Sequence, residues 1–570
     1  MPRADLRLLL AGAAVLLAAA DTYVVVLALP DIMAGVGLDA TELGRAAPIV
    51  SVFLLGYVAM LPAVGRLADL VGRQPVLVGC LLVFALGSLL TATAHTLPGV
   101  VAGRGLQGVG AGGLVPATLA LVADLYPADR RGVPLGAVGA AQEAGALLGP
   151  LYGALVLALA DWQTIFWVNL GAGLLLAAAL VAGRREHPAA TTRRDIVGWA
   201  SWGLAVGGLV LLVSGPATLV NDVTWGVLFE PLAGGGAASS PLAVATAVAA
   251  ALAAARTPAV RRARALAAAA DLPGASIAAL ALGGIVLAFS VADPQRQTLA
   301  DHAPVFLAVS AVCVALFVVR ERRARHPLIP AGSFTSAPAY GGMVVSFFVG
   351  AALIAALVDV PVYGRLTGND QLGAALLLVR LLAAVPVGAL LGGVASQRLG
   401  DRVTTATGAL LAAGGLAAMT RWDTDAPGIL GTAALVVSGL GFGLTIAPIN
   451  ASVLAATGST VHGLASALVV VARTVGMLVG LSVLTAIGLH RFAAESAGIA
   501  SPLQICPDSP TDCPSYDAAV QTAALAEVHA VFLGAAGCAL VAVFAAMLLG
   551  GAAARRETPN GHAEAPPGPS

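Results

Sequence analysis

Charged residues are scarce in this sequence, and lysine is absent from it altogether. Only 11% of the 570 residues are charged, whereas a soluble domain carries about 25%. All 30 positive side chains are arginines, and 30 acidic residues bring the formal net charge to zero. This balance gives no indication of a nucleic-acid partner. A hydrophobic fraction of 58% and a mean hydropathy of +0.91 indicate a chain that is integral to a membrane.

The usual patterns of catalytic and nucleotide-binding sites are missing too. The eight histidines are scattered, with no pair at metal-ligand spacing, and there is no G-x-S-x-G sequence and no phosphate-binding loop. We therefore expect no enzyme activity, no metal and no cofactor. Because no ATP-binding segment is found, any accumulation of a transported compound would have to draw on an ion gradient.

Cysteine is rare as well, with five residues. Cys80, Cys313 and Cys538 lie in apolar runs and are predicted to be small packing residues. Cys506 and Cys513 lie in a polar loop. A disulfide between them would need an oxidising compartment, and the sequence leaves their pairing open.

Long apolar segments fill the first and last thirds of the chain, each near the roughly 20 residues that cross a bilayer. The first six are predicted at 8–30, 46–67, 75–94, 98–125, 133–159 and 164–183. The last six are predicted at 339–362, 372–396, 404–419, 428–454, 464–489 and 519–549. Arginines gather in alternate connections, which predicts a multi-pass protein of the inner membrane with both termini in the cytoplasm.

The middle of the chain is less regular. Segments 275–292 and 304–319 predict a helical hairpin. Before it, segments 196–215 and 241–255 are compatible with a second hairpin, although the latter is short and an interfacial or lumen-side helix is the alternative. The predicted total is 14 helices, or 16 if both hairpins cross the membrane.

These segments predict an all-α membrane protein. We expect an N-terminal six-helix bundle at 1–185 and a C-terminal six-helix bundle at 329–552. A middle linker at 186–328 would carry the inserted hairpin or hairpins. The tail at 553–570 is rich in Pro, Gly and Glu and is predicted to be disordered in the cytoplasm.

The two six-helix blocks also share a pattern of glycines. Glycines recur at nearly constant intervals of 328 or 331 positions, as in 65 and 393, 108 and 439, 110 and 441, 145 and 476, and 149 and 480. A constant interval predicts an internal duplication, the parallel-repeat architecture of two-bundle transporters.

Four segments together resemble the major facilitator superfamily. Residues 65–73 (GRLADLVGR) resemble its cytoplasmic signature, and residues 104–110 (RGLQGVG) resemble the fourth-helix motif of its drug:proton antiporters. Residues 145–153 (GALLGPLYG) resemble the antiporter motif of the fifth helix. Residues 21–30 (DTYVVVLALP) resemble the first-helix motif of the 14-helix subfamily. The resemblance implies the major facilitator fold and proton-coupled export.

A narrower resemblance is to the branch of this family that exports triacylglycerides in mycobacteria. It rests on residues 21–26, on Gln142 and Glu143, and on Val379 and Arg380 before a Pro-Val-Gly run. This branch implies a lipid substrate, a multidrug efflux activity and a periplasmic lipoprotein as partner.

Ionisable residues inside predicted spans are the candidate functional groups, because a charge near the bilayer centre is costly. Asp21 lies near the middle of the first span and Glu143 in the fifth, and both are candidate proton-coupling sites. A guanidinium does not release its proton readily, so Arg380 is predicted to pair with a carboxylate instead. A Glu143–Arg380 ion pair would form an inter-bundle gate in one conformation only.

The fourth-helix motif places Arg104 and Gln107 one helical turn apart, followed by Gly108. Arg104 is compatible with contacts to backbone carbonyls or to Asp21, or with snorkelling to the exoplasmic surface. The same choice is open for Arg473.

The signature motif combines Gly65, Asp69, Gly72 and Arg73. Asp69 is predicted to accept hydrogen bonds from a helix N-terminus of the opposite bundle, where the helix dipole favours an anion. Arg73 would complete a cytoplasmic charge cluster that holds the outward-facing state.

In the antiporter motif, Gly145, Gly149 and Gly153 repeat every four residues and form a smooth stripe on one helix face. Pro150 removes one backbone hydrogen bond and permits a bend. This stripe is predicted to let a neighbouring helix slide, although ordinary tight packing is equally compatible with it.

The leading interpretation is a proton-coupled secondary transporter that exports lipids or drug-like amphiphiles. A multidrug antiporter without a lipid role and a non-transporting membrane scaffold on the same fold are the alternatives. Helices that project beyond the membrane would favour a lipid route, because they could meet a lipid-carrying partner.

Overall fold

The computed structural model describes most of the chain. It covers residues 3–39, 43–182, 196–232, 236, 239–256, 271–289, 302–324, 327–330, 332–368, 371–423, 428–506 and 513–550. Within these ranges the regular structure is helical, with no strand. The tail predicted to be disordered, 553–570, lies outside the described residues.

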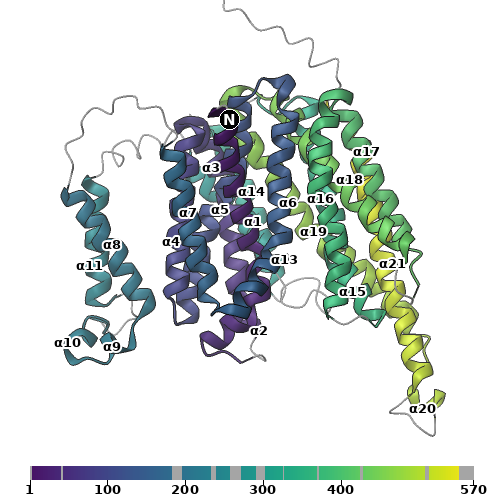
Figure 1. Cartoon of the computed structure of the whole chain (residues 1–570), viewed down its shortest axis with the longest axis horizontal. Helices are drawn as coiled ribbons and strands as arrows, with labels where there is room; N and C mark the ends of the chain where they lie inside the picture. Colours follow the sequence, from purple (N-terminus) through teal and green to yellow (C-terminus); the bar gives the residue numbers. More distant parts are fainter. Residues whose placement is uncertain are drawn as a thin grey trace, which may run out of the picture. The chain divides into compact units, whose positions relative to one another are not determined.

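Long helices follow one another along the chain (Figure 1). Those of the first third are α1 (Arg3–Gly35), α3 (Pro48–Val71), α4 (Arg73–Thr93), α5 (Leu97–Leu125), α6 (Gly132–Leu159) and α7 (Gln163–Ala182). Those of the middle are α8 (Ile196–Ser214), α11 (Pro241–Arg256), α13 (Leu272–Phe289) and α14 (Ala303–Arg323). Those of the last third are α15 (Ala337–Leu366), α16 (Gln371–Leu399), α17 (Asp401–Met419), α18 (Ile429–Ala456), α19 (His462–Ser496) and α21 (Pro514–Ala545).

Single helical turns occur between the long helices. They are α2 (Leu43–Ala46), η2 (Ala128–Arg130), α9 (Ala217–Val220), α10 (Val223–Gly226), η4 (Ser459–Val461), α20 (Pro502–Ile505) and η5 (Ala546–Leu548).

Twelve helices of the described residues are long and apolar enough to cross a membrane. They include α1, α3 to α7 and five of the six helices predicted in the last third, together with α14. The predicted all-α membrane fold is therefore confirmed. Helices α8, α11 and α13 contribute shorter apolar stretches, and α17 has Asp401 and Arg402 in its first turn. The total of 14 or 16 spans stays a prediction.

The described residues form two compact units that do not follow the sequence in simple order. Unit 1 comprises Met1–Leu121, Ala141–Ala331 and Thr460–Thr485, and unit 2 comprises Val122–Ala140, Gly332–Ser459 and Ala486–Ser570. Divisions between the units fall inside the long helices α5, α6 and α19. The bundle boundaries expected from hydropathy stay predictions.

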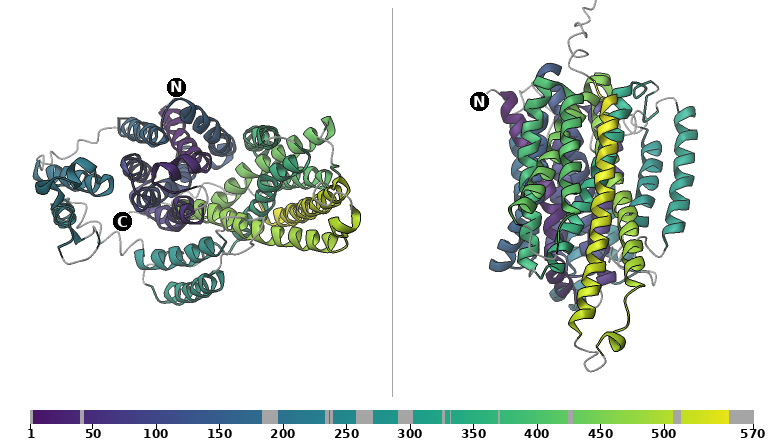
Figure 2. Two further views of the ribbon diagram at one scale, coloured as in Figure 1. Left: turned by 90° about the horizontal axis from the view of Figure 1, so that it is seen from below. Right: turned by 90° about the vertical axis from the view of Figure 1, so that its right-hand side faces the viewer.

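The middle segment contributes two helix pairs to unit 1. Helix α8 packs against α11, and α13 packs against α14 and also against α3. An ion pair of 2.5 Å joins Asp271, just before α13, to Arg320 near the end of α14. The two helices of the α13–α14 pair lie side by side in Figure 2.

Glycine packing repeats between the two halves of the sequence, as the internal duplication predicts. In unit 1, a Cβ on Gly108 would meet the carbonyl oxygen of Phe53. In unit 2, a Cβ on Gly439 would meet the carbonyl oxygen of Leu381. The two glycines are 331 positions apart and their partners 328. Equivalent glycines therefore make equivalent helix contacts, which supports the duplication.

Small residues allow this close approach, because helices inside a bilayer are held by packing rather than by the hydrophobic effect. Gly110 of α5 shows the tightness of the contact. A Cβ there would lie 2.7 Å from the carbonyl oxygen of Cys80 and 2.8 Å from the Cα of Phe84, both in α4.

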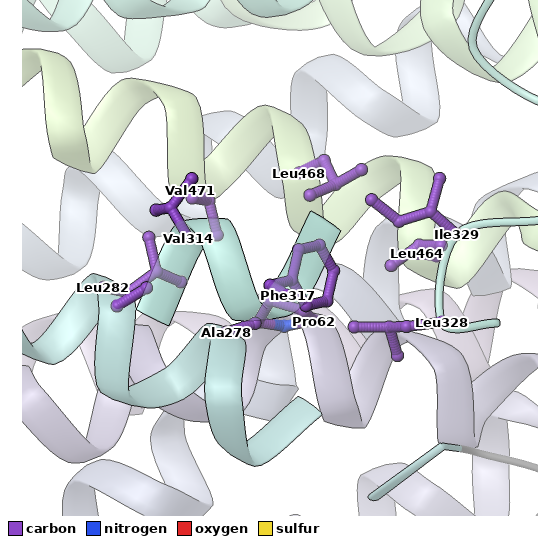
Figure 3. Close-up of a pocket in the computed structure, with 11 residues that line it drawn as sticks. Pro62, Ala278, Leu282, Val314, Phe317, Leu328, Ile329, Leu464, Leu468 and Val471 are labelled. Atoms are coloured by element: carbon purple, nitrogen blue, oxygen red, sulfur yellow. The ribbon is translucent and has the colours of Figure 1, made fainter. Parts of the chain in front are cut away.

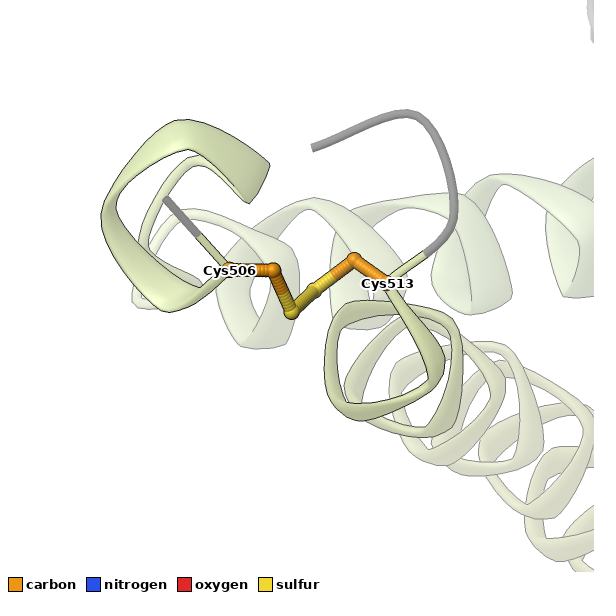
Figure 4. Close-up of a disulfide and its surroundings, with 2 residues drawn as sticks. All are labelled: Cys506 and Cys513. Atoms are coloured by element: carbon orange, nitrogen blue, oxygen red, sulfur yellow. A yellow bond between two sulfur atoms is a disulfide. The ribbon is translucent and has the colours of Figure 1, made fainter. Parts of the chain in front are cut away.

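Cys506 and Cys513, whose pairing the sequence left open, form a disulfide in the connection between α19 and α21 (Figure 4). The bond ties the turn α20 to the start of α21 within unit 2. The other three cysteines, Cys80, Cys313 and Cys538, are free.

We expect Gly110→Leu to destabilise the protein by about 3 kcal/mol, because the new side chain would collide with the backbone of α4. The measurement is the thermal unfolding temperature in detergent. Gly79→Leu is the matched control, since a Cβ at Gly79 meets nothing within 4 Å. Equal losses in the two variants would contradict this packing.

Candidate functional site

Asp21 lies at the centre of a buried polar cluster that joins helices α1, α5 and α7. Its side chain is only 1% exposed. Oδ2 accepts a 2.7 Å hydrogen bond from Nη1 of Arg104, and Oδ1 accepts a 2.6 Å bond from Nδ2 of Asn169 and a 3.4 Å bond from Nε2 of Gln107. Both carboxylate oxygens therefore have donors.

Arg104 is buried in the same cluster and does not reach the surface. Nη1 also donates to Oε1 of Gln107 at 3.0 Å, and Nε donates to the carbonyl oxygen of Ile49 at 3.4 Å. The guanidinium lies 4.1 Å from the centre of the Phe53 ring. Of the alternatives left open for Arg104, the structure shows the contacts with Asp21 and a backbone carbonyl. A buried charge is tolerated when it is paired and hydrogen-bonded in this way.

Glu143 forms the second buried ion pair. Its Oε1 lies 2.7 Å from Nη2 of Arg473, with the two side chains 7% and 18% exposed. Glu143 belongs to α6 and Arg473 to α19. The pair therefore joins two helices that are distant in the sequence, through residues 330 positions apart. Tyr23 and Tyr57 lie near enough to interact electrostatically with both charges.

Glu143 and Arg473 lie at nearly equivalent positions of the internal duplication, on helices α6 and α19. At the interval of 331 positions, the counterpart of Gln142 is Arg473 and the counterpart of Glu143 is the next residue, Thr474. Acid and base therefore occupy neighbouring positions of the two repeats. This interval was the sequence signal that could have identified Arg473 as the partner of Glu143.

Arg380, the partner predicted for Glu143, has an exposed side chain in α16 and donates from Nη1 to the hydroxyl of Thr432 at 2.8 Å. In this structure Glu143 has Arg473 as its bonded partner instead. Because Arg473 already supplies the positive charge that Glu143 needs, a Glu143–Arg380 gate stays a prediction for another conformation.

The signature motif forms a contact that we call the Asp69 latch, made of Asp69, Arg73, Gly463 and Leu464. Oδ1 of Asp69 accepts the backbone N–H of Gly463 at 2.8 Å, and Oδ2 accepts that of Leu464 at 3.0 Å. These are the first amides of α19, so the carboxylate lies at the positive end of a 35-residue helix. Arg73 lies 2.9 Å from Asp69.

Glycines bring the two helices of the Asp69 latch together. A Cβ on Gly65 would lie 2.6 Å from the carbonyl oxygen of Gly463. Gly72 has φ of +100°, a conformation that side chains rarely adopt, and it separates α3 from α4. It also brings Arg73 back towards Asp69.

The second repeat has the same contact without the acid. In unit 2, a Cβ on Gly393 would lie 2.5 Å from the carbonyl oxygen of Gly132, the counterparts of Gly65 and Gly463. The residue equivalent to Asp69 is Gln397. The duplicated contact therefore carries a charged cap in one copy and a neutral side chain in the other.

The antiporter motif packs directly against α1. A Cβ on Gly149 would lie 2.6 Å from the carbonyl oxygen of Ala20, and one on Gly153 would lie 2.6 Å from Cγ2 of Val24. Gly145 contacts α1 one turn earlier, and Pro150 lies inside α6. The helix predicted to slide along the glycine stripe is thus the one that carries Asp21.

Sequence reasoning missed two polar residues that the structure buries. Asn169 of α7 donates to Asp21, and its polar side chain within an apolar run was the available signal. Asp359 of α15 is 8% exposed and interacts electrostatically with Glu527 of α21. Among the described residues, no group of three or more His, Cys, Asp and Glu could hold a metal ion.

A duplicated set of apolar helices, with charges paired inside it, defines a multi-pass membrane transporter. The Major Facilitator Superfamily model matches residues 11–239. The chain is 35% identical over 523 residues to the triacylglyceride transporter of Mycolicibacterium hassiacum, an alignment that covers 90% of this chain and 83% of that one. The chain therefore belongs to the major facilitator superfamily.

Other relatives and solved structures agree with this assignment. A triacylglyceride transporter of Mycobacterium tuberculosis is 35% identical over 508 residues, covering 86% of this chain and 83% of that one. The structure of the proton:xylose symporter XylE matches 95% of this chain and 94% of its own with a TM-score of 0.54 and 15% identity, which supports the fold.

We expect Asp21→Asn to destabilise the protein by about 3–5 kcal/mol, because it leaves the Arg104 guanidinium buried without its counter-charge. Adding Arg104→Gln should recover most of the loss. The thermal unfolding temperatures of the two variants in detergent provide the comparison. A double variant no more stable than Asp21→Asn would show that the ion pair is not what holds the cluster.

Proposed function

We propose that this transporter exports lipids, with triacylglycerides as the substrate class, and that protons drive it through the Glu143–Arg473 ion pair. That ion pair is the single observation that carries the coupling. It is buried, it joins two helices from different repeats, and one of its members can take up a proton. Arg473 stays charged, so Glu143 is the proton-binding member.

Protonation of Glu143 would remove the charge–charge attraction between Glu143 of α6 and Arg473 of α19. A buried arginine without a counter-charge is unfavourable, so the conformation that solvates Arg473 gains population. Proton binding thereby shifts a conformational equilibrium by the difference in ion-pair energy between its two states. The Asp21 cluster is a second candidate proton site, but its carboxylate has donors on both oxygens and its side chain is less exposed.

The Asp69 latch supplies the other element of the cycle. It lies at the end of α3 where arginines indicate the cytoplasmic side, with both chain termini on that side of the inner membrane. A closed latch therefore corresponds to the outward-facing state. Protonation from the outside would weaken the Glu143–Arg473 pair, α19 would leave Asp69, and the transporter would open inward, which is the order that proton antiport requires.

Two observations favour a lipid over a drug-like substrate. The relatives at 35% identity are named triacylglyceride transporters. In addition, α19 has 35 residues and α21 has 32, or about 50 Å at 1.5 Å per residue, against a hydrocarbon core of about 30 Å. Such helices are long enough to project beyond the bilayer.

Helix α19 ends and α21 begins near the Cys506–Cys513 disulfide, a bond that forms in oxidising compartments. In this proposal the two helices therefore project on the periplasmic side. We propose that this projecting end meets a periplasmic lipoprotein that receives the lipid. Efflux of drug-like amphiphiles through the same route is a secondary activity in this proposal.

We expect Glu143→Gln and Arg473→Ala each to lower proton-driven export by at least about tenfold, with strongly non-additive effects in the double variant because both remove one interaction. The measurement is export by proteoliposomes with and without an imposed pH gradient. Arg491→Ala is a matched control, since Arg491 forms an exposed ion pair with Glu495 on the same helix. Additive losses would contradict coupling through this pair.

The substrate is tested in the same vesicles. We expect a fluorescent triacylglyceride to move in the direction set by the pH gradient and to compete with ethidium. Movement of ethidium alone would favour the drug-only antiporter, and movement of neither would favour a non-transporting scaffold.

A further inference from the structure

An apolar pocket lies between the inserted hairpin and two helices of the transporter repeats. It is lined by α3, α13, α14 and α19 and by residues just after α14, all in unit 1. Its volume is about 170 Å³. Every lining residue is apolar, and none offers a polar side chain to a ligand.

Figure 3 shows an elongated arrangement of these side chains. Phe317 lies in the middle, with Leu282, Val314 and Val471 towards one end and Leu464 towards the other. Leu464 and Val471 are seven residues apart on α19, or about 10 Å along the helix axis. The pocket is therefore elongated and apolar along its whole length, which suits a linear hydrocarbon.

The wall at the Leu464 end is fixed by hydrogen bonds rather than by chance packing. Glu321 of α14 accepts the backbone N–H of Leu328 at 2.9 Å and that of Ile329 at 3.0 Å. Both of these residues line the pocket with their side chains. A carboxylate near the end of α14 thus holds Leu328 and Ile329 in place as part of the pocket wall.

We propose that this pocket binds one acyl chain of a membrane lipid. Apolar cavities of about 150 Å³ stay dry and take up hydrocarbon ligands, so water is not the expected occupant. Helices α3, α14 and α19 are all long and apolar enough to cross a membrane. The pocket between them is therefore within reach of bilayer acyl chains. Two sources supply the same chemistry, a bilayer phospholipid and a triacylglyceride.

The position of Leu464 links this pocket to the Asp69 latch. Its side chain lines the pocket while its backbone N–H donates to Asp69. An acyl chain that binds only when α19 lies against the hairpin therefore favours the closed latch. The binding site stands without proton coupling, whereas this effect on the transport cycle rests on the proposed function.

The test uses full-length protein in nanodiscs with two probes, a phosphatidylglycerol and a triacylglyceride that each carry a diazirine at the end of one acyl chain. After photolysis, peptide mass spectrometry locates the label. We expect label on the lining segments of α14 and α19, reduced by at least about tenfold in Ala278→Phe, which fills the pocket. Ala315→Phe is the control, because Ala315 is exposed on α14 and does not line the pocket.

The two probes distinguish the sources. Label from the triacylglyceride alone identifies a substrate chain, label from the phosphatidylglycerol alone identifies a bilayer lipid, and label from both identifies a site for any acyl chain. No label on the lining segments, or equal label in wild type and in Ala278→Phe, overturns the proposal. If Ala278→Phe does not fold, Leu468→Trp fills the same pocket from α19 and gives the same comparison. Because labelling needs no transport, its failure is distinguishable from failure of proton-coupled export.

Discussion

A charge buried inside this protein is costly unless it is paired, because a bilayer offers neither water nor salt to stabilise a lone ion. Two of the ion pairs of unit 1 satisfy this constraint in different ways. Asp21 and Arg104 join helices of one repeat and are enclosed with Asn169 and Gln107. Glu143 and Arg473 join helices of different repeats and are more exposed. The first pair suits a fixed part of the bundle, whereas the second suits a contact that is broken and remade.

Glycines line the contacts between the helices that are proposed to move. Gly145 and Gly149 lie against backbone carbonyls of α1, Gly153 lies against the Val24 side chain, and Gly65 lies against the carbonyl oxygen of Gly463 at the Asp69 latch. Because the glycines present no side chains of their own at these contacts, the helices can approach closely and move past one another. Duplication supplied the Gly65–Gly463 contact twice, and the acid at position 69, replaced by Gln397 in the other copy, makes one of the two contacts sensitive to the helix dipole of α19.

Hydropathy, arginine placement and the glycine interval were sufficient to predict a duplicated all-α membrane protein, because span length and the spacing of repeats can be read from the sequence alone, and the four motifs indicated the family fold. The partner of Asp69 could be predicted as well, since a helix N-terminus is a general anion site. The partner of Glu143 was harder to predict, because Arg380 and Arg473 are both arginines in apolar runs and only the interval of 331 positions, which pairs Gln142 with Arg473, favours Arg473. Asn169 and the apolar pocket beside Phe317 likewise depend on helices that are distant in sequence.

The central claim is that protonation of Glu143 opens the Asp69 latch. It is tested most directly by a distance between spin labels on either side of that latch, at Val71 and Thr460, both exposed. The account predicts one short distance at alkaline pH, a longer population that grows on acidification, and the longer population at every pH in Glu143→Gln. A distance that responds neither to pH nor to that substitution would contradict it.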